Sequence, residues 1–212
     1  MAKAALVQQE VKIPAPKMQA ATFLLRGIAP YVQNKFSAKA KEQIKRTQEA
    51  GPTAKSRRQR EPKDFLECYE QAIHRAKEGW YGIPANGIRA AMISACRTVG
   101  YAMTRAKLGF FVMADGYDAD DGTPLVKITK GEPHYSETPV RNESGVIDIR
   151  ARPVWDPGWE AEVKIRFDSD LFTLDDIANL LLRAGQQVGI GEGRPDSKNS
   201  CGMGWGLFEI IS

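Results

Sequence analysis

The sequence has 212 residues, 42% hydrophobic and 26% charged, with 30 Lys and Arg against 26 Asp and Glu. This composition suits one globular domain, and no run reaches the roughly 18 apolar residues that a membrane span needs, which excludes an integral membrane protein. The first ten residues hold no long apolar stretch, so we expect no secretory signal.

The cysteines and histidines are too few and too scattered for a standard metal site. Cys68, Cys96 and Cys201 form no CxxC pair, and the histidines are His74 and His134. An odd number of widely spaced cysteines favours reduced thiols, so we expect a cytoplasmic protein with no disulfide, metal or cofactor. Nothing nearby in the sequence supports a cysteine-histidine nucleophile pair.

The first predicted element is a strand over 20–27, which Gly27 and Pro30 close. Residues 35–63 then hold ten Lys or Arg against three Glu, a local net charge of +7. A charge block of this kind attracts phosphates, and we interpret it as a mobile segment that contacts nucleic acid. The alternative is a solvated loop that only aids solubility. The candidate contact residues are Lys45, Arg46, Arg57, Arg58 and Arg60.

Two helices are expected next. Phe65, Tyr69 and Ile73 recur at helical spacing and predict a helix over 63–77 that ends at Gly79. A second helix should begin at Asn86, whose side chain is a good N-cap, and should run to about residue 106.

The second half of the chain alternates short strands, loops and one more helix. Strands are expected over 109–114, 125–128, 145–151, 159–167 and 207–211, with a helix that begins after Thr173 and closes at Gly185. The strand over 159–167 has the clearest period of two. The Asp-rich stretch 115–123 resembles a calcium loop superficially, but position 12 from Asp115 is Val126 instead of Glu, so we expect a solvated turn.

Without the insertions, the order is strand, helix, strand, strand, helix, strand. This order predicts an α+β fold with a ferredoxin-like, or RRM-like, βαββαβ core and an antiparallel sheet. The chain is then a single domain, 1–212, with core segments 20–27, 86–114 and 145–212. The insertions are 28–85, which contains the basic segment 35–63, and 115–144.

A glycine-rich segment over 185–206 lies between the last helix and the last strand, and seven of its 22 residues are glycine. Glycine allows positive φ and exposes bare amides that can bind anions. The segment lacks the GxxxxGK[ST] pattern, which disfavours a mononucleotide hydrolase. The alternative is a tightly packed connection without a ligand. The candidate contact residues are Gly189, Gly191, Gly193, Arg194, Lys198 and Trp205.

This glycine-rich loop resembles the signature of the RAMP superfamily, the RNA-binding proteins of CRISPR effector complexes. The run Tyr81-Gly82-Ile83-Pro84-Ala85-Asn86-Gly87-Ile88-Arg89-Ala90-Ala91 is similar to the family's start of the first core helix, although Ala85-Asn86-Gly87 replaces Gly-Ser-Ser. Residues 25–31 look like its first strand and turn. The resemblance is greatest to the backbone subunit, or to solitary phage or mobile-element relatives. It implies sequence-independent binding of single-stranded RNA and side-by-side assembly, with Arg26 and Arg89 on the phosphates.

The hypothesis is therefore a protein that binds single-stranded RNA or DNA and forms a homo-oligomer or filament, without catalytic residues and without a membrane. Three alternatives stay open. One is a metal-independent endoribonuclease, which needs a general base such as His74 or His134, although each of these is more simply a surface histidine. Another is an acidic, metal-dependent nuclease. The third is an assembly protein that binds no nucleic acid.

Overall fold

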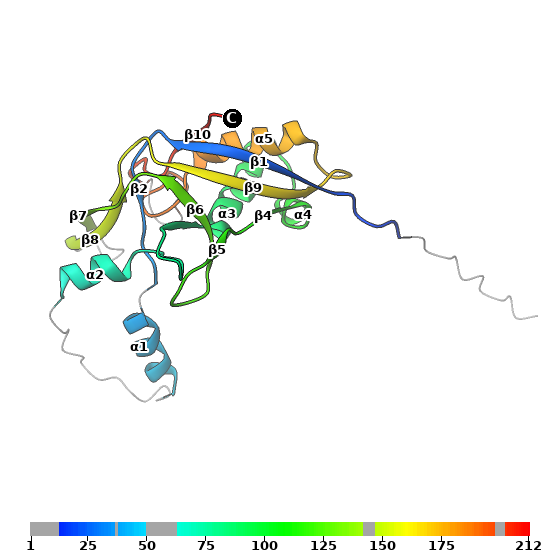
Figure 1. The fold of residues 1–212 in the computed structure, drawn as a ribbon. Helices are drawn as coiled ribbons and strands as arrows, with labels where there is room; N and C mark the ends of the chain where they lie inside the picture. The colour runs from blue at the N-terminus through cyan, green and yellow to red at the C-terminus, as the bar shows by residue number, and fades with distance from the viewer. Residues whose placement is uncertain (1–12, 37, 50–62, 142–146, 198–201) are drawn as a thin grey trace, which may run out of the picture.

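The computed structural model describes residues 13–36, 38–49, 63–141, 147–197 and 202–212, and it shows a mixed α/β fold with antiparallel sheets (Figure 1). The central pair of the larger sheet is β1 (Met18–Gly27) with β9 (Glu160–Asp168). β10 (Phe208–Ile210) pairs with the other edge of β1. β4 (Phe110–Val112) and β6 (Pro124–Lys130) share the far edge of β9, and β3 (Gly82–Pro84) and β5 (Gly116–Tyr117) both pair with β6.

The predicted alternation of the last long strand is confirmed in β9. Ala161, Val163, Ile165 and Phe167 are buried, while the residues between them are exposed. One face of the sheet therefore packs on helices, and the other faces solvent.

Two helices cover the buried face. α3 (Ala85–Ala95) contributes Ile88 and Met92 to the core, and α5 (Leu174–Arg183) contributes Ile177 and Leu181. The start of α5 is confirmed at Thr173. Its hydroxyl accepts a hydrogen bond from the Asp176 amide at 3.1 Å, and the Asp176 carboxylate accepts one from the Thr173 amide. This capping box fixes the first turn of α5.

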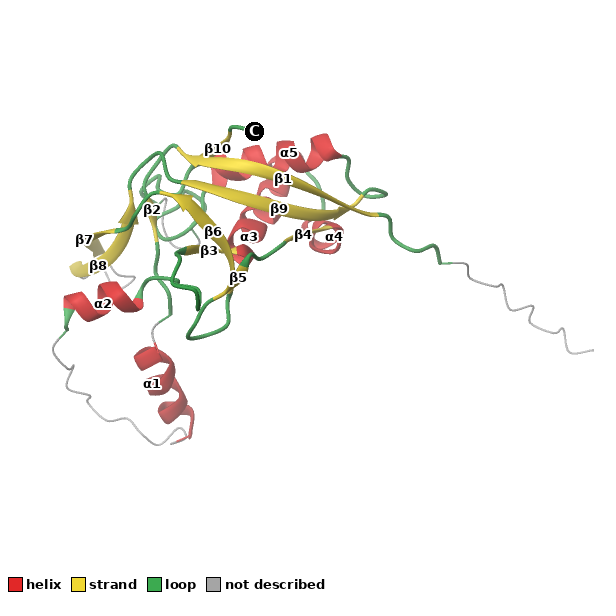
Figure 2. Ribbon diagram, viewed as in Figure 1, coloured by secondary structure: helices red, strands yellow, loops and turns green. Residues whose placement is uncertain are grey.

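A smaller sheet contains β2 (Tyr31–Val32), β8 (Ile147–Trp155) and β7 (His134–Arg141) in the order β2-β8-β7. α2 (Phe65–Gln71) packs against β8, whereas α1 (Ala38–Glu49) stands apart from both sheets (Figure 2). No helix in the described ranges is long and apolar enough to cross a membrane.

The prediction of a single helix up to residue 106 is wrong. α3 passes into a 3₁₀ turn over Cys96–Val99, which ends where Gly100 takes φ +68°, and a separate helix, α4 (Met103–Gly109), follows. Positive φ at a glycine is a common helix end. The predicted N-cap is also wrong, because Pro84 takes that position without a side-chain bond and Asn86 is exposed within the helix.

The helix expected over 63–77 is shorter than predicted. α2 ends at Gln71, and the chain turns back so that the Gly82 amide donates to the His74 carbonyl and the Ala76 amide donates to the Trp80 carbonyl. Ile73 and Ala76 are buried in this hairpin, so tertiary packing decides the local structure here, although Ile73 continues the helical spacing of apolar residues. The stretch between the strands expected over 125–128 and 145–151, for which no element was predicted, contains β7, which pairs with β8 over eight residues.

Candidate nucleic-acid interface

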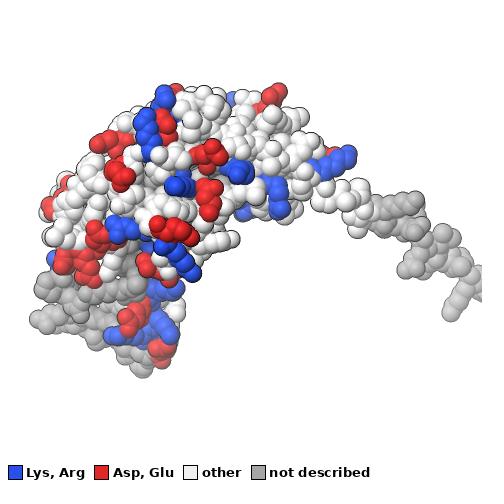
Figure 3. All heavy atoms as spheres, in the orientation of Figure 1, with Lys and Arg blue, Asp and Glu red and all other residues white. Residues whose placement is uncertain are grey.

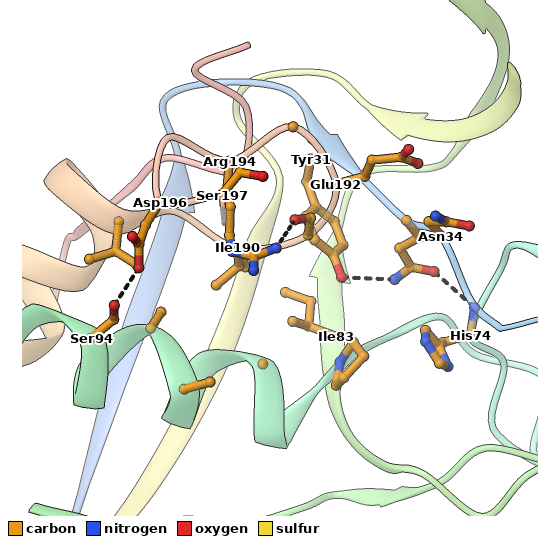
Figure 4. A pocket seen from close by; sticks show the side chains of 18 residues that line it. Tyr31, Asn34, His74, Ile83, Ser94, Ile190, Glu192, Arg194, Asp196 and Ser197 are labelled. Atoms are coloured by element: carbon orange, nitrogen blue, oxygen red, sulfur yellow. Dashed lines mark hydrogen bonds between the residues drawn. The ribbon is translucent and has the colours of Figure 1, made fainter. Parts of the chain in front are cut away.

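A cavity of about 580 Å³ opens between three segments of the chain (Figure 4). Its floor is α3, which contributes Gly87, Ala91 and Ser94. One wall is the stretch from Tyr31 to Asn34, and the other is the glycine-rich loop over 188–197. The cavity therefore lies on the helical side of the larger sheet, and its size is typical of a ligand site.

The glycines of this loop are required by its path. Gly189, Gly191 and Gly193 have φ between +73° and +77°. A Cβ on Gly191 would lie 2.4 Å from the Val32 carbonyl oxygen, and one on Gly193 would lie 2.4 Å from the Trp205 ring. The glycines thus serve close packing on one side of the loop, while Gly191 and Gly193 also line the cavity.

Arg194 lies in the rim of the cavity. Its side chain is exposed, and one guanidinium nitrogen donates to the Gly191 carbonyl at 2.9 Å. Nearby, Asp196 accepts a hydrogen bond from the Ser94 hydroxyl and forms an ion pair with Arg97 at 2.6 Å. The Ser94 hydrogen bond, helped by Arg97, lowers the pKa of Asp196, so this carboxylate is charged. It joins the loop to α3.

Two further arginines converge on the loop from β8. Arg150 Nη1 lies 2.7 Å from Glu192 Oε1, and Arg152 Nε lies 2.5 Å from Glu192 Oε2. Sequence analysis missed these residues. The signal available in the sequence was a pair of arginines at positions i and i+2, because residues with this spacing share one face of a strand.

The opposite end of the cavity holds a buried ion cluster. His74 lines the cavity, and its Nδ1 lies 2.9 Å from Asp118 Oδ2. The other oxygen of Asp118 lies 2.6 Å from Lys35 Nζ, which also contacts Asp120 at 2.7 Å. Two predictions are therefore wrong. The loop over 115–123 is not a solvated turn at Asp118, which is 1% exposed, and His74 is not a surface histidine, because it is 9% exposed.

The electrostatics of this cluster follow from burial and pairing. Burial lowers the pKa of His74, and the hydrogen bond to Asp118 opposes this only in part. For Asp118, burial is the largest single effect and would raise the pKa, but the hydrogen bonds from Lys35, the Asp120 amide and His74, together with the Lys35 charge, outweigh it, so the pKa is lowered. The neutral imidazole therefore faces a charged carboxylate, which places the imidazole hydrogen on Nδ1 and a lone pair on Nε2.

His74, Asp118 and Asp121 place candidate metal-ligand atoms within 4.8 Å of one another. The Lys35 ammonium already neutralises Asp118 at close range. A divalent cation there would be repelled by that fixed charge, so the group is better described as an ion-pair cluster than as a metal centre.

Several predicted contact residues lie away from the cavity. Arg26 points to the solvent face of the sheet, where it pairs with Glu160 at 3.2 Å. Arg89 donates to the carbonyls of Phe110 and Lys107 and so ties α3 to the chain around β4. Lys45 and Arg46 lie in α1, where each pairs with a glutamate four residues away. These positions argue against a direct role in the cavity.

The remaining predicted residues are either outside the described ranges or packed. Arg57, Arg58, Arg60 and Lys198 lie outside the described residues. Trp205 is half-buried, with its ring against Gly193. Trp155 and Trp159 are core residues.

The charge distribution is mixed on the face with β1 and β9. Figure 3 shows Lys and Arg interspersed with Asp and Glu there, without a large area of one sign. Cross-strand pairing of Arg26 and Lys130 with Glu160 accounts for part of this pattern. The open sheet face is therefore a poor surface for a polyanion.

No family model matches this sequence, and no curated protein matches it. Among solved structures, the chain is similar to one in the cryo-EM structure of the Type III-B Cmr-beta bound to cognate target RNA, with 12% identity and a TM-score of 0.47. The match covers 92% of this chain and 60% of that chain, so this chain spans about three fifths of its length. A likeness of this degree assigns neither a family nor a function.

Proposed function

We propose that the protein binds single-stranded nucleic acid, RNA by preference, and holds its phosphates in the cavity between α3 and the glycine-rich loop. The observation that carries this proposal is the convergence of four guanidinium groups on that loop. Arg194 belongs to the loop, Arg97 reaches it from α3's end, and Arg150 and Arg152 reach it from β8.

The charge balance of this site favours a polyanion. Four arginines contact the loop, whereas two carboxylates, Glu192 and Asp196, neutralise them among the described residues. Of the four arginines, Arg194 lines the cavity itself, and the other three contact the loop that forms its wall. Arginine also matches the oxygen geometry of phosphate better than lysine does.

Sequence-independent binding agrees with the other lining groups. Ser94, Ser197 and Asn34 offer neutral hydrogen-bonding groups, and the aromatic rings in the described lining of the cavity are those of Tyr31 and the buried His74. Tyr31 is 1% exposed, so it has little surface for stacking. Contacts to phosphate and sugar would then dominate binding.

The strand order also supports a specific fold assignment. Strands β10, β1, β9 and β4 are adjacent in this order, with α3 between β1 and β4 in the chain and α5 between β9 and β10. We propose that this is the ferredoxin-like core of a RAMP-type protein, with 28–85 and 115–144 as its insertions.

Binding can be tested by fluorescence anisotropy with a labelled U30 RNA between 50 and 300 mM salt. The expected result is a steep loss of affinity with salt, because each single-strand phosphate contact contributes a slope of about −0.7. Arg194→Glu should weaken binding about tenfold by reversing one charge in the cavity. Lys17→Glu is the matched control, because Lys17 pairs with Asp170 at the distant end of β1. Equal losses in both variants would contradict a site in the cavity.

Self-assembly along the strand belongs to the same proposal. Ile147 and Ile149 in β8 are 63% and 47% exposed, which leaves an apolar strip for contact with another copy. Light scattering with and without U30 tests this, and nuclease treatment distinguishes an RNA-organised oligomer from a protein that assembles without nucleic acid.

A second candidate function is metal-independent RNA cleavage, because His74 presents a neutral imidazole to the same cavity. Its Nε2 would accept the proton of a ribose 2′-hydroxyl as O2′ attacks the adjacent phosphorus, while the P–O5′ bond breaks and O5′ takes up a proton from water. The products are a 2′,3′-cyclic phosphate and a 5′-hydroxyl. Discrete cleavage of labelled RNA in EDTA, lost in His74→Ala and kept in His134→Ala, would support it. Intact RNA with the wild-type protein would exclude it.

A further inference from the structure

The contact between β8 and the glycine-rich loop is made by charged side chains. Two guanidinium groups, from Arg150 and Arg152, hold the two oxygens of one carboxylate, Glu192. We call these three residues the arginine clasp. Its side chains are 33%, 16% and 19% exposed, so the clasp is partly accessible to solvent, and its Glu192 also lines the cavity.

The clasp has the geometry of an anion site. The guanidinium groups of Arg150 and Arg152 approach the two oxygens of one carboxylate, at 2.7 Å and 2.5 Å. Paired arginines that converge on two oxygens also form the arrangement that binds a phosphate, because carboxylate and phosphate present their oxygens to guanidinium groups in a similar way.

The carboxylate of Glu192 is not needed to hold the loop against the smaller sheet. The backbone amide of Glu192 donates to the Val32 carbonyl at 2.9 Å, and the close contact of Gly191 with the same strand adds to this attachment. On the other side, the Asp196 pair with Arg97 ties the loop to the end of α3. The main chain therefore stays fixed when the side chain of Glu192 leaves Arg150 and Arg152.

We propose that Arg150 and Arg152 are a phosphate subsite and that Glu192 is its resident carboxylate, which a phosphodiester of the bound strand displaces. This inference rests on the proposed function and extends it. Glu192 competes with the ligand for the two arginines, and this competition sets the affinity for nucleic acid.

The test compares two variants that each remove one negative charge from an ion pair. Glu192→Gln removes the competing charge in the clasp, while Asp170→Asn removes a charge from the Lys17 pair at the distant end of β1. Affinity for labelled U30 is measured by anisotropy at 100 mM salt, and thermal unfolding of each variant checks that it is folded. Glu192→Gln should bind about fivefold more tightly than wild type, and Asp170→Asn should stay within about twofold.

A double-mutant cycle locates the effect. Arg150→Lys with Arg152→Lys keeps both charges but loses the planar donor arrangement, so this variant should bind more weakly than wild type. In that background, Glu192→Gln should gain less than in the wild-type background, since the subsite is already lost.

The outcomes separate this inference from the proposed function. If the wild-type protein binds RNA and Glu192→Gln binds no more tightly than Asp170→Asn, the clasp is only a structural tie and the subsite is refuted, while the cavity proposal stands. If neither wild type nor Glu192→Gln binds RNA at any salt concentration, both proposals fail.

Discussion

The molecule contains two ion clusters that each contribute one residue, His74 or Glu192, to the lining of the cavity, and they differ in burial. The cluster of Lys35, Asp118 and His74 is enclosed, with Asp118 at 1% exposure. The arginine clasp is partly open, with Arg150 at 33%. Both join segments that are far apart in the sequence.

This difference in burial predicts a different role for each cluster. Removing one partner of a buried pair leaves an uncompensated charge and costs several kcal/mol, so the Asp118 cluster is expected to support the fold. A partly exposed pair contributes less to stability than a fully buried one, so its partners can exchange for a ligand. The following experiments separate these roles.

The largest effect is expected from Asp118→Ala. This change leaves Lys35 buried without its closest partner and should lower the free energy of unfolding by about 3–5 kcal/mol in urea titrations. Asp120→Ala is the matched control, because Asp120 contacts the same ammonium group but its side chain is 75% exposed. The free energy of unfolding of the control should fall by no more than about 1 kcal/mol. Similar losses in the two variants would mean that burial does not distinguish the carboxylates.

Next in size is Gly191→Ala. It should lose more stability than Gly158→Ala, although both glycines have positive φ. The added methyl at Gly158 meets open space, so only the backbone cost of about 1–3 kcal/mol applies there. At position 191 the added methyl would also lie 2.4 Å from the Val32 carbonyl oxygen, and this clash adds to the backbone cost. Equal midpoints in urea would show that the loop does not need close approach to β2.

A smaller effect concerns pH. Because the pKa of His74 is lowered on folding, the unfolded chain binds more protons, and stability should rise from pH 5 to pH 7. Its contribution is complete above the unfolded pKa of about 6.5 and is lost as the pH falls through the folded value. The lowered pKa of Asp118 acts in the same direction at more acidic pH.

His74→Gln should therefore flatten the dependence of the melting temperature on pH between 5 and 7. An unchanged slope in His74→Gln would show that His74 is not the group that titrates.

The smallest effect is expected from Arg26→Gln. Arg26 lies on the solvent face of the sheet and shares Glu160 with Lys130, so the pair should contribute less than about 1 kcal/mol. Affinity for U30 should change by less than about twofold. A tenfold loss in anisotropy would instead place the ligand on the sheet face.

The elements that local chemistry specifies could be predicted from the sequence. The alternation over 159–167 gives β9, and Thr173 with Asp176 gives the start of α5. The sequence shows a glycine at position 100, but a glycine can also lie within a continuous helix. Its φ depends on the packing of Tyr101 and α4, which the sequence alone does not show.

The site was predictable only in part, for a physical reason. The glycine-rich loop could be found because its composition is local. The clasp and the Asp118 cluster join residues separated by 40 to 83 positions, and tertiary packing alone brings them together. Charge density along the chain pointed to α1, where Lys45 and Arg46 pair with neighbouring glutamates instead.

The most direct test is photocrosslinking of the wild-type protein to 4-thiouridine-substituted U30, followed by mass spectrometry of the crosslinked peptides. We predict crosslinks within residues 188–197, the first turns of α3 and the Arg150–Arg152 part of β8. Crosslinks confined to β1 and β9, around Arg26, Lys164 and Arg166, would contradict the account.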